Sequence, residues 1–138
     1  AEKYAALVFH VRTGVAAQDR KGSSHGDNYV LKKLFKNRPY DALHRKHCSA
    51  ALFRSGSKVL DLGANIGAFA LQAAFNGCSV TALEPDGETF RLLQRNVRAN
   101  SGSCSGSVDA LQAAVAHKEG KGKLLLYPKM AKQKEAVQ

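Results

Sequence analysis

One stretch decides the fold: Val59-Leu60-Asp61-Leu62-Gly63-Ala64-Asn65-Ile66-Gly67. Its apolar run predicts a parallel strand, because strands buried on both faces of a sheet are apolar throughout. Gly63 is expected to turn the backbone with a positive φ, and Gly67 to let the helix that follows lie close to the strand. The N-terminus of that helix would direct backbone N–H groups at the strand end, which predicts a nucleotide-cofactor site.

A second acid follows the next predicted strand, residues 79–83, in the order Glu84-Pro85-Asp86. A carboxylate at this strand end can accept hydrogen bonds from both ribose hydroxyls of a nucleoside. A dinucleotide fingerprint has three glycines, G-x-G-x-x-G, whereas Asn65 stands in the middle position here. A pyrophosphate needs that middle glycine for close approach of the backbone, and S-adenosylmethionine (SAM) has no phosphate. The pattern therefore favours SAM over NAD.

Around this centre the sequence predicts an alternation of strands and helices. Asp27 and Asp86 are expected to start helices as N-caps, and glycines to end others. The expected strands are 4–13, 59–62, 79–83, 108–115 and 123–127, and the expected helices are 27–37, 41–53, 66–76 and one beginning after Asp86.

The chain has 138 residues, which suits one domain but falls short of the roughly 200 expected for a complete doubly wound methyltransferase. We expect three parts. Residues 1–56 form an N-terminal strand and helical lead-in, residues 57–128 form a SAM-binding Rossmann-like core, and residues 129–138 form a basic, disordered tail.

The net charge of +10 is unevenly distributed. Residues 1–58 carry twelve Lys/Arg against four Asp/Glu, residues 59–117 carry three against five, and residues 118–138 carry six against two. The cofactor segment is slightly acidic, and the basicity lies in the flanks. Such flanks can attract nucleic acid, but a solvated basic surface without a dedicated partner is an equally good interpretation.

Cysteine and histidine spacing argues against a metal site. The three cysteines are odd in number and lack C-x-x-C spacing, which favours free thiols in the cytoplasm or another reducing compartment. The five histidines show no ligand spacing, so no metal is expected. No apolar run approaches the roughly 20 residues needed to cross a bilayer.

Taken together, the motifs resemble the FkbM-type SAM-dependent methyltransferases over roughly residues 25–127. The matching parts are the "DxGANxG" turn at 61–67, the "EPD" motif at 84–86, a helix with Asn96 and Asn100, and a strand at 112–116.

The resemblance implies a role for each residue of the cofactor site. Asp61 would hold the ammonium group of the methionine moiety, and Glu84 the ribose hydroxyls. The wall against methionine and ribose would be formed by Gly63, Ala64, Asn65 and Gly67. The adenine would lie near Pro85, Asp86, Gln112 and Ala113.

The family continues into a fourth strand with an acidic motif that has no counterpart here. The expected fold is therefore an α/β, Rossmann-like SAM-methyltransferase sheet with helices on both faces, truncated after the third or fourth strand. The strand at 59–62 would be an open apolar edge that a partner chain could cover. No catalytic base is assigned, because the family supplies such groups from the missing part.

Three functions remain open on the sequence alone. The first is SAM-dependent O-methylation of a small-molecule or glycan hydroxyl, and the second is an RNA methyltransferase, suggested by the basic flanks. The third is a non-catalytic SAM-binding or interaction module.

Overall fold

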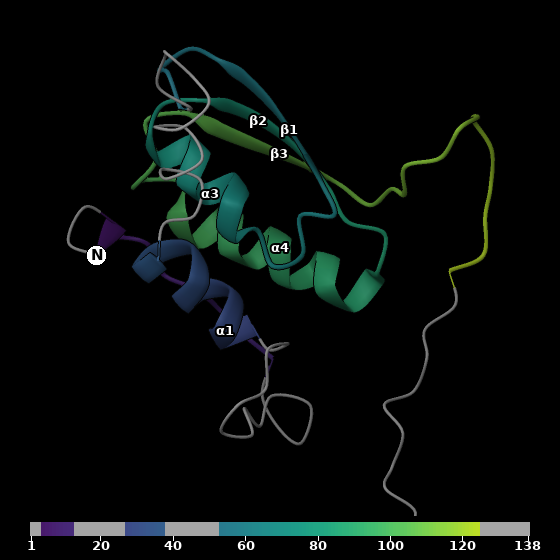
Figure 1. Cartoon of the computed structure of the whole chain (residues 1–138), viewed down its shortest axis with the longest axis horizontal. Coiled ribbons are helices and arrows are strands. Elements are labelled where there is room, and N and C mark those ends of the chain that lie inside the picture. Colours follow the sequence, from purple (N-terminus) through teal and green to yellow (C-terminus); the bar gives the residue numbers. More distant parts are fainter. Residues whose placement is uncertain (1–3, 13–26, 38–52, 125–138) are drawn as a thin grey trace, which may run out of the picture.

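A computed structural model describes residues 4–12, 27–37 and 53–124. Its elements, in chain order, are α1 (Asp27–Lys32), the π-helix η2 (Lys33–Asn37), β1 (Lys58–Leu62), α3 (Ala68–Phe75), β2 (Ser79–Leu83), α4 (Gly87–Asn100) and β3 (Ser107–Leu111). The three strands form one parallel sheet in the order β1-β2-β3 (Figure 1). The predicted α/β class is confirmed.

The core lies between the sheet and two helices, α3 and α4, which are on the same side of it (Figure 1). Val59, Val80 and Val108 pair across the three strands and point into this core. They pack with Phe90 and Leu93 of α4 and with the buried alanines of α3. The small side chains of α3 let the helix lie close to the strands.

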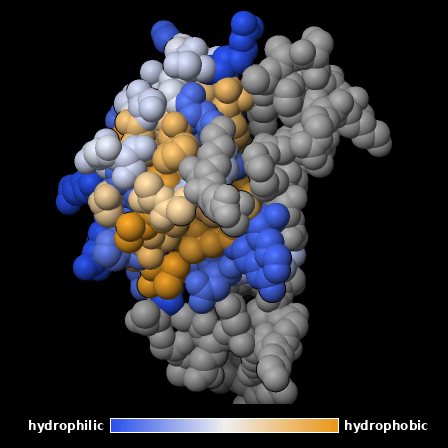
Figure 2. Space-filling view, turned by 90° about the vertical axis from the view of Figure 1, so that its left-hand side faces the viewer, coloured by the Kyte–Doolittle hydropathy of each residue, from blue (hydrophilic) through white to orange (hydrophobic). Residues whose placement is uncertain are grey.

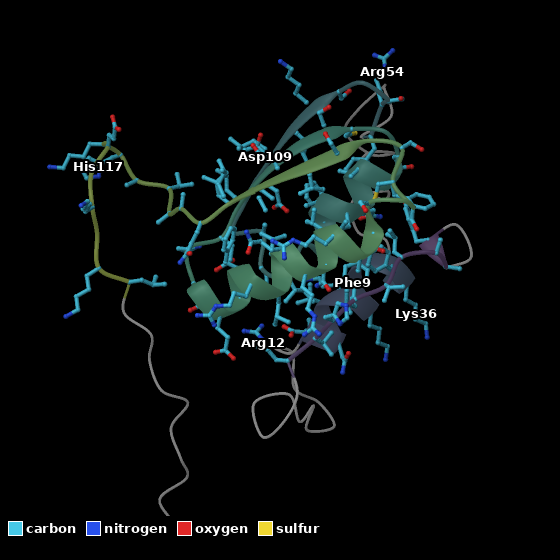
Figure 3. All side chains as sticks on the ribbon, turned by 180° about the vertical axis from the view of Figure 1, so that it is seen from behind. Phe9, Arg12, Lys36, Arg54, Asp109 and His117 are labelled. Atoms are coloured by element: carbon cyan, nitrogen blue, oxygen red, sulfur yellow. The ribbon has the colours of Figure 1, made fainter. Side chains whose placement is uncertain are left out.

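The opposite face of the sheet exposes apolar side chains. Leu60 and Leu62 of β1 are 61% and 53% exposed, and Leu111 of β3 is exposed as well. Asp109 of β3 also points away from α4 on this face (Figure 3). The helices of the described residues thus cover one of the two faces. The expectation that β1 forms an edge is confirmed for the described sheet.

The N-terminal segment, residues 7–12, is not the strand that its alternating pattern predicted. Its backbone pairs with two asparagine side chains of α4 instead of with a strand. The Asn100 side chain accepts from Val8 N–H at 2.7 Å and donates to Val8 O at 2.7 Å. Asn96 does the same for His10, at 2.6 and 3.1 Å. An extended chain is therefore docked on a helix, with its polar groups satisfied by amide side chains.

An aromatic cluster attaches this segment and α1–η2 to α3. The ring centroid of Tyr4 lies 5.5 Å from that of Phe35 and 5.2 Å from that of Phe75, and Phe9 lies 5.4 Å from Phe35. The Tyr4 hydroxyl accepts from the Asn76 side chain at 3.1 Å. On this side of the molecule hydrophobic residues form a continuous area bordered by hydrophilic ones (Figure 2).

Other sequence predictions have mixed outcomes. The helix from Asp27, the helix after Asp86 and the strand at 79–83 are confirmed, and the helix predicted at 66–76 forms over Ala68–Phe75. The strand predicted at 108–115 ends at Leu111: Glu84 N–H still donates to the Leu111 carbonyl at 3.1 Å, but the next N–H on that side, of Asp86, donates to the Glu84 side chain instead. The strand predicted at 123–127 is described only at residues 123–124, which are not in a strand. The helix predicted at 41–53 is described only at Phe53, which is not helical. The predicted tail, residues 129–138, lies outside the described residues.

Candidate functional site

The turn between β1 and α3 uses its backbone N–H groups internally. Gly63 and Ala64 both donate to the carbonyl of Leu83 at 2.9 Å, and Asn65 N–H donates to the Glu84 carboxylate at 2.9 Å. A phosphate-binding loop needs such N–H groups free for its ligand. The turn is therefore better suited to a ligand without a phosphate, as the missing middle glycine indicated.

Three residues of the turn have positive φ, 77° at Gly63, 52° at Asn65 and 87° at Gly67. A Cβ atom on Gly63 would meet nothing within 4 Å, so the space beside this residue is open. A Cβ atom on Gly67 would lie 2.6 Å from Cδ1 of Leu93 in α4. Gly67 thus faces Leu93 of α4 and no strand atom, which corrects the prediction that it serves the packing of α3 on the strand.

Asp61, the last residue but one of β1, has one carboxylate oxygen without a hydrogen-bond partner among the described residues. This oxygen, Oδ2, is shielded from solvent. Burial raises the pKa of Asp61 to about 6; a hydrogen bond from the Ala70 backbone opposes the shift, and the charge of Glu84 adds to it. A cationic group of a ligand would satisfy the free oxygen and favour the ionised carboxylate.

Glu84 follows β2 directly and is buried. Its Oε2 accepts from Asn65 N–H at 2.9 Å, and its Oε1 accepts from Asp86 N–H at 3.0 Å. The carboxylate thus ties the glycine turn to the start of α4. Each carboxylate oxygen accepts up to two hydrogen bonds, so Glu84 retains acceptor capacity for ligand hydroxyls.

The remaining predicted site residues lie on the α4 side. Asp86 is the N-cap of α4, and its Oδ1 accepts from Thr89 N at 2.8 Å and from Thr89 Oγ1 at 2.6 Å. The pKa of Asp86 is lowered, first by these two bonds from Thr89 and then by the charges of Arg12 and Arg91. The exposed Gln112 reaches the Pro85 carbonyl at 3.5 Å. Ala113 is half-buried, beyond the end of β3.

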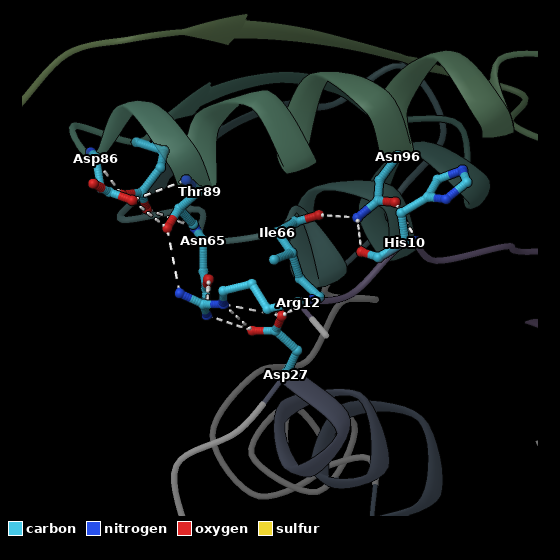
Figure 4. Close-up of polar contacts among 9 residues, drawn as sticks. His10, Arg12, Asp27, Asn65, Ile66, Asp86, Thr89 and Asn96 are labelled. Carbon is cyan, nitrogen blue, oxygen red and sulfur yellow. Dashed lines mark hydrogen bonds and ion pairs between the residues drawn. The ribbon is translucent and has the colours of Figure 1, made fainter. Parts of the chain in front are cut away.

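Arg12 is a member of this site that the sequence interpretation missed. Its guanidinium forms a salt bridge with Asp27 at the start of α1, and its backbone N–H donates to the same carboxylate at 2.9 Å. The guanidinium also reaches the side-chain oxygens of Asn65 and Thr89, each at 3.4 Å (Figure 4). Arg12 therefore connects the N-terminal segment to the glycine turn and to α4. Only the tertiary fold brings these residues together, so no spacing in the sequence could indicate it.

Asn96 adds a second connection to the same turn. Besides pairing with His10, its side chain donates to the Ile66 carbonyl at 2.8 Å (Figure 4). Asn96 is fully buried. Asn96 thus holds the turn through its backbone, while the Asn100 side chain bonds to Val8 and to the Asn96 carbonyl.

The site offers hydrogen-bond acceptors to a ligand and few free hydrogen-bond donors. Asp61 and Glu84 stand at neighbouring strand ends, where Asp61 could take an ammonium group and Glu84 could take hydroxyls. Among the described residues no group of His, Cys, Asp and Glu side chains could hold a metal ion. Cys78 and Cys104 are free thiols whose pKa is raised by burial. The described helices include none that is long and apolar enough to cross a membrane.

Comparison with known proteins gives one partial similarity. No protein-family model matches the chain. A stretch of 50 residues is 42% identical to part of a tRNA (guanine(37)-N(1))-methyltransferase of Danio rerio. The match covers 36% of this chain and 10% of that relative. The similarity thus points to methyltransferases in general terms and spans a small part of the relative.

Proposed function

We propose that the chain is the SAM-binding part of a SAM-dependent methyltransferase, of the FkbM type that its motifs resemble. The observation that carries the proposal is the shielded, unpartnered Oδ2 of Asp61, next to the buried Glu84 and an open glycine turn. A group with an ammonium and two vicinal hydroxyls suits these two carboxylates, and SAM carries both. The partial similarity to a methyltransferase supports the same cofactor.

Each residue would contribute binding and orientation. Asp61 would accept a hydrogen bond from the ammonium group, and Glu84 would accept from the ribose hydroxyls while still holding the turn. Asp86 and Gln112 would border the adenine. When bound, SAM supplies a reactive sulfonium methyl, so holding donor and acceptor in line provides much of the rate acceleration. A hydroxyl acceptor also needs a base within hydrogen-bond reach, and none is assigned.

The test is calorimetric titration of the purified chain with S-adenosylhomocysteine (SAH). We expect micromolar binding that is lost in Asp61→Asn and retained in Asp109→Asn, an exposed acid on the opposite sheet face. Glu84→Gln keeps a side-chain acceptor for the turn and should bind more weakly. A folded chain that does not bind SAH, or equal losses in the Asp61 and Asp109 variants, would refute the proposal.

Two acceptors remain as candidates. The FkbM resemblance implies a small-molecule or glycan hydroxyl. The relative named above is a tRNA methyltransferase, which favours RNA as the second candidate. Methylation of either class by the chain, alone or with a partner, would decide between them.

A non-catalytic module is the alternative to an enzyme. The exposed Leu60 and Leu62 on the edge strand β1 favour a partner chain at this edge. Light scattering tests it, since a discrete dimer or hetero-complex would favour this reading and a well-behaved monomer would argue against it.

A further inference from the structure

The N-terminal segment, residues 7–12, is attached to the molecule without burying its own side chains. None of its residues is buried, and the side chain of Val8 is 55% exposed. Its backbone bonds instead to the side chains of Asn96 and Asn100 in α4 and of Asp27 in α1. A segment with few buried apolar contacts opens locally at a lower free energy than the core does. The segment is therefore expected to leave α4 while the sheet and its helices stay folded.

One end of the segment contacts both loops of the candidate site through Arg12. Its guanidinium donates to the side-chain oxygens of Asn65 and Thr89, each at 3.4 Å (Figure 4). Asn65 has a positive φ of 52°, which costs free energy in a residue other than glycine, and its N–H donates to Glu84 Oε2 at 2.9 Å. The Thr89 hydroxyl in turn donates to Asp86 Oδ1 at 2.6 Å. The orientation of these two carboxylates thus depends in part on contacts that the segment supplies.

A second connection between the segment and the glycine turn runs through Asn96. Its side chain accepts from His10 N–H at 2.6 Å and donates to the Ile66 carbonyl at 2.8 Å (Figure 4). One buried amide therefore bonds to the segment and to the turn at the same time. The pair of Val8 with Asn100 has a different place, because Asn100 is the last residue of α4 and the candidate site adjoins its first.

We infer that docking of the N-terminal segment on α4 is coupled to binding of the cofactor, so that each strengthens the other. The inference rests on the proposed function and adds a regulatory element to the same site. The docked segment holds the turn and the Glu84 carboxylate in one arrangement, and a preorganised site binds its ligand at a lower entropic cost. Because linkage is reciprocal, a cofactor that prefers the docked state must stabilise docking by the same factor.

Native-state hydrogen exchange tests the effect of the ligand on the segment. The amides of Val8, His10 and Arg12 report docking, since each N–H donates to a side chain of α4 or α1. We expect saturating SAH to slow their exchange about fivefold or more, which is the usual range of coupling between two sites. The control is the Ser57 amide just before β1, which donates to the Arg54 carbonyl and should exchange at an unchanged rate.

A matched pair of variants at Val8 tests the effect of the segment on the ligand. Val8→Pro removes the N–H that donates to Asn100, whereas Val8→Ala keeps this N–H and shortens an exposed side chain. Both substitutions are at the end of α4 that is remote from the candidate site. By calorimetry we expect Val8→Pro, with faster exchange at His10, to bind SAH about three- to fivefold more weakly, and Val8→Ala to bind within about twofold of wild type.

The outcomes separate this inference from the cofactor proposal. Slower exchange of the segment amides in SAH, together with weaker SAH binding by Val8→Pro alone, supports the coupling. A wild-type chain that binds SAH without slower exchange at His10 and Arg12 refutes the coupling and leaves the cofactor proposal standing.

Three other results also overturn the coupling. One is unchanged SAH affinity in Val8→Pro when its His10 amide exchanges faster, because the segment then leaves α4 without any effect on the site. Another is equal slowing at Ser57, which would mean that SAH stabilises the whole molecule. A chain that does not bind SAH refutes the coupling and the cofactor proposal together.

Discussion

Asp61→Asn should stabilise the ligand-free protein while it removes SAH binding. Burial raises the pKa of Asp61 from 3.8 to about 6. A difference of about 2.2 in pKa, at 1.36 kcal/mol each, is a cost of about 3 kcal/mol for the ionised carboxylate. Because this carboxylate is still partly exposed, solvent screening reduces that cost to about 1–2 kcal/mol. A neutral amide of the same shape does not incur it.

The direction of the stability change depends on pH. The folded state binds the Asp61 proton more tightly than the unfolded state, so the cost is absent below pH 3.8. It grows as the pH rises through about 6 and is constant above that value. Urea denaturation should therefore give nearly equal stabilities for wild type and Asp61→Asn at pH 4. At pH 8 the variant should be more stable by about 1–2 kcal/mol.

Two results would contradict this reasoning. One is a variant that is less stable than wild type at pH 8, and the other is a stability difference that is the same at both pH values. Asp109→Asn, on an exposed strand position, serves as the control and should show no such divergence. In wild type, SAH affinity should also fall below about pH 6, since protonated Asp61 no longer attracts an ammonium group.

Three further predictions concern the scaffold. Gly106→Ala should cost more than about 3 kcal/mol in thermal denaturation, because its Cβ would lie 2.0 Å from the Cys78 carbonyl oxygen; an unchanged melting temperature would contradict that contact. Asn100→Ala should cost about 2 kcal/mol and speed hydrogen exchange at Val8, whose N–H loses its partner; full protection there would count against the pairing. Arg12→Gln should weaken SAH binding several-fold, with partial recovery in Arg12→Lys, and equal affinities would show that the guanidinium does not position the turn.

Elements with strong local signals could be predicted from the sequence. The strand Ser79–Leu83 has the predicted bounds, and Asp86 caps α4 as its type and position indicated. In both cases the sequence signal is local: the strand is a short run between Gly77 and Glu84, and Asp86 caps α4 through Thr89, three residues further on. The predicted site residues around Asp61 and Glu84 are also brought together, because consecutive parallel strands place their carboxyl ends side by side.

The features that could not be predicted from the sequence depend on contacts between residues far apart in the chain. Residues 7–12 alternate like a strand, but alternation does not reveal that their partners are side chains on a helix. Arg12 acts through residues that are 15, 53 and 77 positions away. The length of β3 was overestimated because its apolar pattern continues beyond Leu111, where its neighbour has already turned into α4.

The asparagine pairing of the N-terminal segment has a consequence for the order of folding. Val8 and Asn100 are 92 residues apart, and His10 and Asn96 are 86 apart, so these contacts close nearly the longest loops of the described chain. The loop-closure entropy of such contacts is large, and both partners are usable only after α4 has formed. The segment that is made before the rest of the described residues is therefore the one that docks last, and pulse-labelled hydrogen exchange should show its amides protected after those of the sheet.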